Sequence, residues 1–128
     1  MSIMGIGTDL VKISRIKKVY KKYPQGFSER ILHVNELPIL KEHPSPKTFI
    51  AKRFAAKEAL AKALGTGIAK GVSFRDIEVS NDDNGQPKLT LHGKTKKVAE
   101  KLGVKRIFIS LTDEVKYAIA YVILEGYR

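Results

Sequence analysis

The sequence predicts an α+β fold with a mainly antiparallel sheet and one long packed helix. Three observations lead to this prediction. An apolar strand opens the chain, helical patterns dominate the first half, and a hairpin followed by two apolar strands occupies the second half. Helices and strands that are segregated along a chain are typical of α+β domains. The chain has 128 residues without a shift in composition, so residues 1–128 are expected to form a single domain.

A short strand is expected at residues 3–9, running into a turn that contains Gly5 and Gly7 and ends on a carboxylate. Ser14 is expected to cap the first helix, because serine is a favoured N-cap. Pro24 is expected to end that helix. Positions spaced at i, i+3, i+4 and i+7 give it an apolar face made of Ile16, Val19, Tyr20 and Tyr23.

Two further helices are predicted before the midpoint of the chain. A short one is expected around residues 35–40, with Pro38 tolerated in its first turn. Ser45 followed by a proline is a strong start signal for a long helix over residues 47–64. Gly65 is expected to end that helix in the left-handed C-cap conformation.

In the second half of the chain, a hairpin is expected with strands at residues 74–80 and 88–91. A short helix is expected at 94–102, followed by apolar strands at 106–111 and 117–124. The sequence Asp-Asn-Gly at residues 83–85 predicts a tight primed turn, because Asn-Gly readily adopts positive φ angles. Both faces of the last strand are apolar. It is therefore expected to lie at the centre of a sheet or at an interface.

Charge and composition exclude several classes of protein. The chain carries 24 Lys and Arg against 13 Asp and Glu, a net charge of +11, so a polyanion is an expected partner. It has no cysteine, which excludes disulfides and thiolate metal sites. No apolar stretch approaches the roughly 18 residues of a membrane span, and the first residues lack a secretory signal pattern. A cytoplasmic protein without a membrane span is expected.

Four charged residues interrupt the apolar, alanine-rich helix at residues 47–64. At about 100° per residue, Lys57 projects within the apolar stripe and Arg53 at its edge, while Glu58 and Lys62 lie along the opposite flank. One interpretation is structural, with a Glu58 to Lys62 ion pair on a solvated flank. The other is a binding site, since charged residues are rarely buried unless they are paired or liganded.

Asp9 is open to the same two interpretations. Turn chemistry alone explains an aspartate after two glycines. Alternatively, carboxylates without a cluster of histidine or cysteine suit Mg²⁺, which takes oxygen ligands together with substrate phosphates. With lysine and arginine nearby, such a site would handle a phosphate ester or a diphosphate. The glycine-rich loop after Leu64 matches neither the common phosphate loop nor the dinucleotide turn.

Five segments carry a family resemblance: GIGTDLV at 5–11, RFAAKEA at 53–59, KALGTG at 62–67, NDDNGQP at 81–87, and ISLTD at 109–113 with YA at 117–118. Together they resemble the holo-acyl-carrier-protein synthase family of 4′-phosphopantetheinyl transferases. No single segment is decisive, but five in this order and spacing are specific, and the resemblance covers essentially the whole chain.

The resemblance implies an enzyme that transfers 4′-phosphopantetheine from coenzyme A to a serine of apo acyl carrier protein, for fatty acid biosynthesis. The reaction would depend on Mg²⁺ and release adenosine 3′,5′-bisphosphate. The resemblance also implies a homotrimer with its sites between neighbouring subunits. Each site would then take Asp9 and Glu58 from one chain and the late-strand segment from another.

The resemblance implies roles for individual residues as well. Asp9, Glu58 and Lys62 would be catalytic, with Asp9 and Glu58 holding the metal. A metal-bound water oriented by Glu58, ranked slightly ahead of Glu58 itself, would take the serine proton. The residues expected to bind coenzyme A are Arg53, Lys62, Gly65, Thr66, Gly85, Pro87 and Ser110.

The basic helix near the N-terminus resembles the family's docking surface for acyl carrier protein. That partner is acidic, so complementary charge would speed and orient the encounter. The expected docking residues are Arg15, Lys18, Lys22 and Arg30.

The chain departs from the family pattern at Asp113, where many relatives carry a histidine, which puts a role for this position in doubt. Ordinary surface or loop positions are expected for His33, His43 and His92. A competing interpretation is a small basic nucleic-acid-binding domain, favoured by the charge. No stacking-aromatic RNA motif or DNA-binding helix pair supports it, so no specific nucleic acid is expected as a partner.

Overall fold

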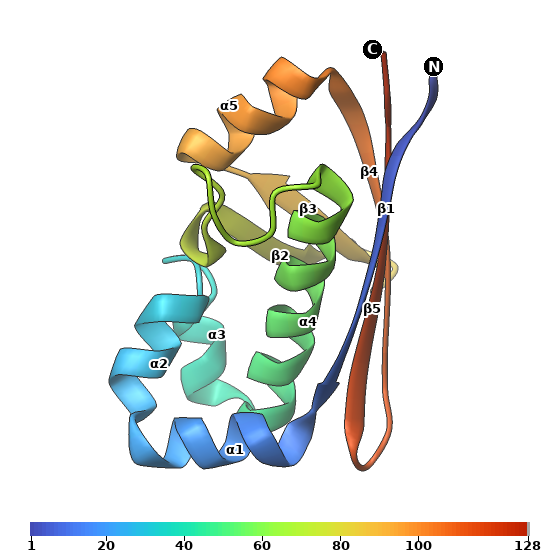
Figure 1. Cartoon of the computed structure of the whole chain (residues 1–128). Coiled ribbons are helices and arrows are strands. Elements are labelled where there is room, and N and C mark those ends of the chain that lie inside the picture. The colour runs from blue at the N-terminus through green and yellow to red at the C-terminus, as the bar shows by residue number, and fades with distance from the viewer. Residues whose placement is uncertain (128) are drawn as a thin grey trace.

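The computed structural model describes residues 1–127, in which two antiparallel sheets accompany five α-helices (Figure 1). The elements are β1 (Ser2–Lys12), α1 (Ile13–Lys22), α2 (Pro24–Ile31), α3 (Leu37–Glu42), α4 (Pro46–Leu64), the 3-10 turn η1 (Phe74–Asp76), β2 (Ile77–Asn81), β3 (Pro87–Leu91), α5 (Gly93–Leu102), β4 (Val104–Asp113) and β5 (Tyr117–Gly126). The predicted α+β class with antiparallel strands is confirmed. Within residues 1–127, every helix is too short or too polar to span a membrane.

Helix α4 packs along one face of the larger sheet, whose strand order is β1-β5-β4 (Figure 1). The smaller sheet, β2-β3, and helices α1 to α3 lie around the remaining sides of α4. The buried alanines of α4 pack in the core against the buried face of β5, which contributes Ala120, Val122 and Leu124. Strand β5 is central, as its two apolar faces predicted.

Strand β1 is longer than predicted, because its glycines belong to the strand and not to a turn. A Cβ added at Gly7 would lie 2.0 Å from the carbonyl oxygen of Ala59, and one at Gly5 would lie 2.1 Å from that of Ala63. Only glycine lets the strand backbone approach the helix backbone this closely. Because side chains alternate along a strand, Asp9 lies on the same face as the glycines and meets α4.

The first helices also differ from the prediction. Helix α1 begins at Ile13 without a side-chain cap, so Ser14 lies in its first turn. Its buried positions are Ile13 and Ile16, whereas Val19 and Tyr23, expected on the apolar face, are exposed. Pro24 ends α1 as predicted, but it also starts α2, a helix that the sequence analysis did not predict.

The remaining elements follow the prediction with shifted ends. The short helix at 35–40 is observed as α3 and the long helix at 47–64 as α4, which Gly65 ends with a φ of 83°. The strand predicted at 74–80 begins only at Ile77, because Phe74–Asp76 form the turn η1. The tight hairpin turn is a longer loop, in which the carboxylate of Asp82 accepts the backbone N–H groups of residues 84 and 86.

The face of the larger sheet opposite α4 is apolar and exposed. Pairing in register brings together Ile6, Ile123 and Phe108 in one row and Leu10 and Ile119 in another. Tyr121 lies between these rows, and all of these residues except the half-buried Ile123 are exposed. An apolar patch of this kind is characteristic of an interaction surface.

Candidate functional site

The site forms where β1 crosses the C-terminal half of α4. The ammonium group of Lys62 donates hydrogen bonds to Oδ1 of Asp9 and to the backbone carbonyl of Thr8, each 3.0 Å long. Asp9 is 14% exposed and Lys62 is 51% exposed, so the pair lies at the edge of the core and is open to solvent on one side. Lys62 thus pairs with Asp9, in place of the structural Glu58 to Lys62 pair considered from the sequence.

Glu58 belongs to the same group of charges. Its pKa is raised above the ordinary value, first because the carboxyl is partly buried and second because the negative charge of Asp9 is close. The positive charge of Lys62 acts in the opposite direction and does not cancel these effects. The structure therefore brings together the three residues expected to be catalytic, from two elements separated by some fifty positions.

The donor set suits a hard cation. Oδ2 of Asp9 is buried and has no hydrogen-bond partner among residues 1–127. An unpaired buried carboxylate oxygen is costly, and a second carboxylate nearby raises the cost further. A divalent cation would remove both costs, and oxygen ligands without nitrogen or sulfur are those that Mg²⁺ prefers.

On another face of α4, Glu36 forms a buried hub that the sequence analysis did not identify. Its carboxylate pairs with Lys57 and Arg53 and accepts the backbone N–H groups of His33 and Val79. Lys57 is fully buried and also donates to the carbonyl of residue 31. Burial lowers the pKa of Lys57 to about 8, and the attraction of Glu36 limits the fall. No periodic signal marks Glu36, which precedes α3 in a loop.

Arg53 is positioned by this hub and not by the Asp9 carboxylate. Its guanidinium contacts Oε2 of Glu36 at 3.2 Å, donates to the carbonyl of Val79 and stacks over the ring of Phe49. Burial lowers its pKa from the ordinary value, with Glu36 acting against the fall. The expected contact of Arg53 with coenzyme A stays a prediction.

The other residues expected at the coenzyme A site lie in three separate places. Gly65 and Thr66 form the turn at the end of α4, where the backbone N–H of Thr66 bonds to the carbonyl of residue 61. Gly85 lies in the hairpin loop and Pro87 begins β3, and within residues 1–127 no hydrogen bond or ion pair joins them to Asp9, Glu58 or Lys62. Ser110 pairs with Tyr121 on the exposed sheet face, opposite α4.

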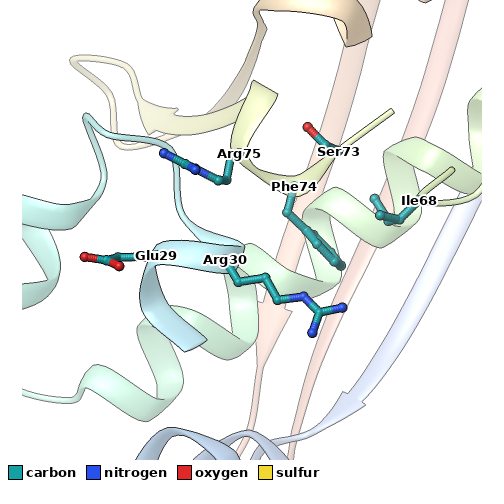
Figure 2. Close-up of a pocket in the computed structure, with 6 residues that line it drawn as sticks. All are labelled: Glu29, Arg30, Ile68, Ser73, Phe74 and Arg75. Carbon is teal, nitrogen blue, oxygen red and sulfur yellow. The ribbon is translucent and has the colours of Figure 1, made fainter. Parts of the chain in front are cut away.

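The four expected docking residues are all exposed. Arg15, Lys18 and Lys22 project from one side of α1, and Arg30 lies in the last turn of α2. Arg30 also lines an open cleft of about 440 Å³ together with Glu29, Ile68, Ser73, Phe74 and Arg75. Figure 2 shows the cleft between α2 and the segment that carries Phe74.

Asp113 and the histidines have local partners. Asp113 pairs with Lys52 at 3.0 Å, near the start of α4. The expectation of ordinary positions fits His43, whose Nδ1 accepts the backbone N–H of Ser45. His33 and His92 also lie in loops, where their rings stack with centroids 4.3 Å apart.

Two carboxylates and an ammonium group at the junction of a strand and a helix are typical of an enzyme that acts on phosphate groups. The family model described as the 4′-phosphopantetheinyl transferase superfamily matches residues 5–122. The chain therefore belongs to this superfamily, and it is an enzyme, a phosphopantetheinyl transferase. The family resemblance seen in the sequence is confirmed.

Curated relatives agree with this assignment. The chain is 51% identical over 126 residues to a holo-[acyl-carrier-protein] synthase of Photobacterium profundum, covering 98% of this chain and 100% of the relative. It is 50% identical over 124 residues to the protein of the same name from Hydrogenovibrio crunogenus, covering 97% and 98% respectively.

Solved structures show the same fold. A holo-[acyl-carrier-protein] synthase from Neisseria meningitidis superposes with a TM-score of 0.93 at 43% identity, covering 97% of this chain and 99% of that one. A holo-(acyl-carrier-protein) synthase from Bacillus anthracis in complex with CoA (3′,5′-ADP) superposes with a TM-score of 0.84 at 40% identity. The match covers 99% of this chain and all of the other.

Proposed function

We propose that this enzyme transfers the 4′-phosphopantetheine group of coenzyme A to a serine of apo acyl carrier protein. The products are holo acyl carrier protein, for fatty acid biosynthesis, and adenosine 3′,5′-bisphosphate. The observation that carries the proposal is the buried, unpaired Oδ2 of Asp9 beside Glu58 and Lys62. The names of relatives about 50% identical over nearly the whole chain support the substrates.

Asp9 and Glu58 would hold one Mg²⁺ as the cofactor. When bound, the ion supplies positive charge that neutralises the diphosphate of coenzyme A. Two observations support a cation at this point: one oxygen of Asp9 is buried without a hydrogen-bond partner, and the pKa of Glu58 is raised, first by burial and second by the negative charge of Asp9.

Residues of the chain then perform two tasks in the reaction. Lys62, half exposed beside Asp9, presents its ammonium group to the phosphate oxygens on which charge develops. A water oriented by Glu58 takes the proton of the serine hydroxyl. The serine oxygen bonds to the β-phosphorus of coenzyme A, and the bond from that phosphorus to the bridging oxygen breaks.

Coenzyme A would bind along the turn at Gly65 and Thr66 and extend toward Arg53, Gly85 and Pro87. Ser110 lies on the sheet face opposite Asp9, so the two residues cannot serve one site within a single chain. This arrangement supports a homotrimer in which a neighbouring chain contributes Ser110 to each site. The exposed apolar rows on that sheet face support the same assembly.

The acidic carrier protein would dock on α1 and the end of α2 through Arg15, Lys18, Lys22 and Arg30. All four side chains are exposed, and the exposed Val19 and Tyr23 add apolar contact area beside them. The reaction would take place in the cytoplasm, with the chain acting as one domain.

Intact-mass spectrometry of apo acyl carrier protein tests the proposal. The carrier is incubated with this enzyme, coenzyme A and Mg²⁺, beside a sample that contains a chelator. A gain of one phosphopantetheine that the chelator prevents is the expected result. No gain with any of several carrier proteins would overturn the proposal.

A further inference from the structure

Three polar side chains from separate segments of the chain lie close together, and none of them belongs to the Asp9, Glu58 and Lys62 site. His33 follows α2, Glu78 lies in β2 and His92 follows β3. Nε2 of His92 lies 2.9 Å from Oε1 of Glu78, and Nδ1 of His33 lies 3.9 Å from the same oxygen. One ligand atom from each residue lies within 4.8 Å of the others.

The cluster is partly buried, and its negative charge is that of the single carboxylate of Glu78. The side chains of His33 and Glu78 are 13% and 18% exposed, and that of His92 is 37% exposed. Burial alone would raise the pKa of Glu78, but hydrogen bonds from His92 and Asn35 and the nearby histidines hold it below the ordinary value. Glu78 is therefore an ionised carboxylate that accepts hydrogen bonds from Nε2 of His92 and from the side-chain amide of Asn35.

Hydrogen bonding fixes which nitrogen of each ring faces the carboxylate. The backbone N–H of Asn35 donates to Nδ1 of His33 at 3.0 Å, so Nδ1 carries the lone pair of that ring and this hydrogen bond occupies it. Nε2 of His92 faces Glu78 directly. One ligand atom from each of the three residues thus lies close to the other two, although the lone pairs of the stacked rings do not point to a common centre.

We infer that His33, Glu78 and His92 form a binding site for a transition-metal ion such as Zn²⁺, distinct from the Asp9 and Glu58 carboxylates. Two imidazoles and one carboxylate are ligands that Zn²⁺ favours over Mg²⁺. A tetrahedral zinc site holds its ligand atoms about 3.3 Å apart, which lies between the 2.9 and 3.9 Å distances from Oε1 of Glu78 to the two ring nitrogens.

Binding requires small movements of the residues around the site. The two rings are stacked at an interplanar angle of 21°, so both cannot face one ion until one of them turns. His92 is the more exposed ring and is the one that turns, with its proton moving to Nδ1. At His33 the ion replaces the N–H of Asn35, an exposed residue whose amide then bonds to water. A water completes the four ligands.

The bound ion would tie the loop after α2 to the small sheet. His33 also donates its backbone N–H to Glu36, the hub that pairs with Lys57 and Arg53. The site is therefore a structural clamp on the segment that carries Glu36, and it takes no part in the transfer reaction.

Isothermal titration of the full-length enzyme with Zn²⁺, in excess Mg²⁺, tests the inference. The wild type is expected to bind one Zn²⁺ per chain, and His92→Ala and Glu78→Gln are each expected to bind roughly tenfold or more weakly. His43→Ala is the matched control, since His43 has the same local bond to a backbone N–H but, within residues 1–127, no ion pair with a carboxylate. It is expected to bind as the wild type does.

A spectroscopic measurement covers the case in which a variant does not fold. Co²⁺ added to the wild type should give the visible absorption of a four-coordinate site, and NMR should show the ring protons of both histidines leaving their stacked environment. Absence of Zn²⁺ binding by the wild type overturns the inference. Unchanged affinity in folded His92→Ala, or loss of affinity in His43→Ala, overturns it equally.

Discussion

The ammonium nitrogen of Lys62 lies 3.0 Å from Oδ1 of Asp9, although the two residues are 53 positions apart in the sequence. The other oxygen of Asp9 is buried without a partner, and Glu58 is close enough for its pKa to respond to both charges. One lysine therefore faces two carboxylates, which leaves an excess of negative charge at the point where a cation and a diphosphate would meet.

Asp9→Asn and Glu58→Gln are each expected to lower the transfer rate by roughly a hundredfold or more, because each removes the charge of a proposed metal ligand without changing its volume. The rate is measured by mass spectrometry of acyl carrier protein at saturating Mg²⁺. Near-normal activity in either variant would show that the ligand assignment is wrong.

The same Glu58→Gln variant is expected to be at least as stable as the wild type without Mg²⁺. The pKa of Glu58 is raised in the folded chain, so its ionised form is disfavoured there, and the wild type gains stability as pH falls through that raised pKa. The amide removes this dependence. Thermal unfolding by circular dichroism at neutral and acidic pH provides the comparison.

Gly7→Ala is expected to destabilise the fold by about 3 kcal/mol, since its Cβ would meet the carbonyl of Ala59 and force strand and helix apart. Gly26→Ala is the matched control. Gly26 lies within α2 with nothing within 4 Å of an added Cβ, so alanine is expected to add roughly 0.5 kcal/mol of stability. Urea unfolding of both variants measures the difference; equal midpoints would contradict the backbone contact.

Lys57→Met is expected to cost about 3 kcal/mol at neutral pH, because it leaves the buried Glu36 without one of its partners. It should also change the pH dependence. In the wild type the folded pKa is about 8 and the ordinary value is 10.5. Between these values the unfolded chain holds a proton that the native chain has lost, so this group makes stability rise with pH.

Urea midpoints at pH 8 and pH 10.5 measure that rise as the difference between wild type and Lys57→Met. Lys41→Met, at an exposed position of α3, is the control and should keep the wild-type pH dependence. A parallel pH dependence in wild type and Lys57→Met would contradict the assignment.

Charge reversal on α1 is expected to affect the carrier protein and not coenzyme A. Arg15→Glu combined with Lys18→Glu should raise the KM for acyl carrier protein by roughly tenfold, with the KM for coenzyme A unchanged. Lys97→Glu combined with Lys101→Glu on α5 changes the net charge by the same amount at exposed positions away from α1 and serves as the control. An equal effect of all the reversals would indicate attraction by net charge alone.

Ile119→Asp is expected to convert the proposed trimer to monomers, because it places a charge within the exposed apolar rows of the larger sheet. Size-exclusion chromatography with light scattering measures the mass. Thr90→Asp, at an exposed position of β3, should leave the assembly unchanged. A wild-type monomer at micromolar concentration would contradict the trimer.

Much of the fold was predictable because its signals are local. The long helix and its end at Gly65 follow from serine, proline and glycine at positions that suit a helix boundary. Helix α2 was missed because Pro24 is equally suited to ending one helix and starting the next. The glycines of β1 were assigned to a turn. Glycine is required there because the backbone of α4 lies against the strand, and that part of the chain is over fifty positions away in the sequence.

The candidate site was predictable in its residues but not in its pairing. The family resemblance indicated roles for Asp9, Glu58 and Lys62, while spacing alone favoured a structural Glu58 to Lys62 pair. Lys57 stood out as a charge in an apolar stripe, but its partner Glu36 lies in a loop without periodicity. The cluster of His33, Glu78 and His92 joins three segments through tertiary contacts, which no sequence pattern encodes.

The burial of Lys57 has a practical consequence for measuring motions of α4. Reagents that acylate amines reach Lys62 in the native state, but they reach Lys57 only when the helix separates from the loop that holds Glu36. The ratio of labelling rates at the two lysines, followed by peptide mass spectrometry, therefore reports the free energy of that local opening. Since Glu58 adjoins Lys57 in the chain, the same ratio shows whether binding of coenzyme A tightens the helix that carries the reactive carboxylate.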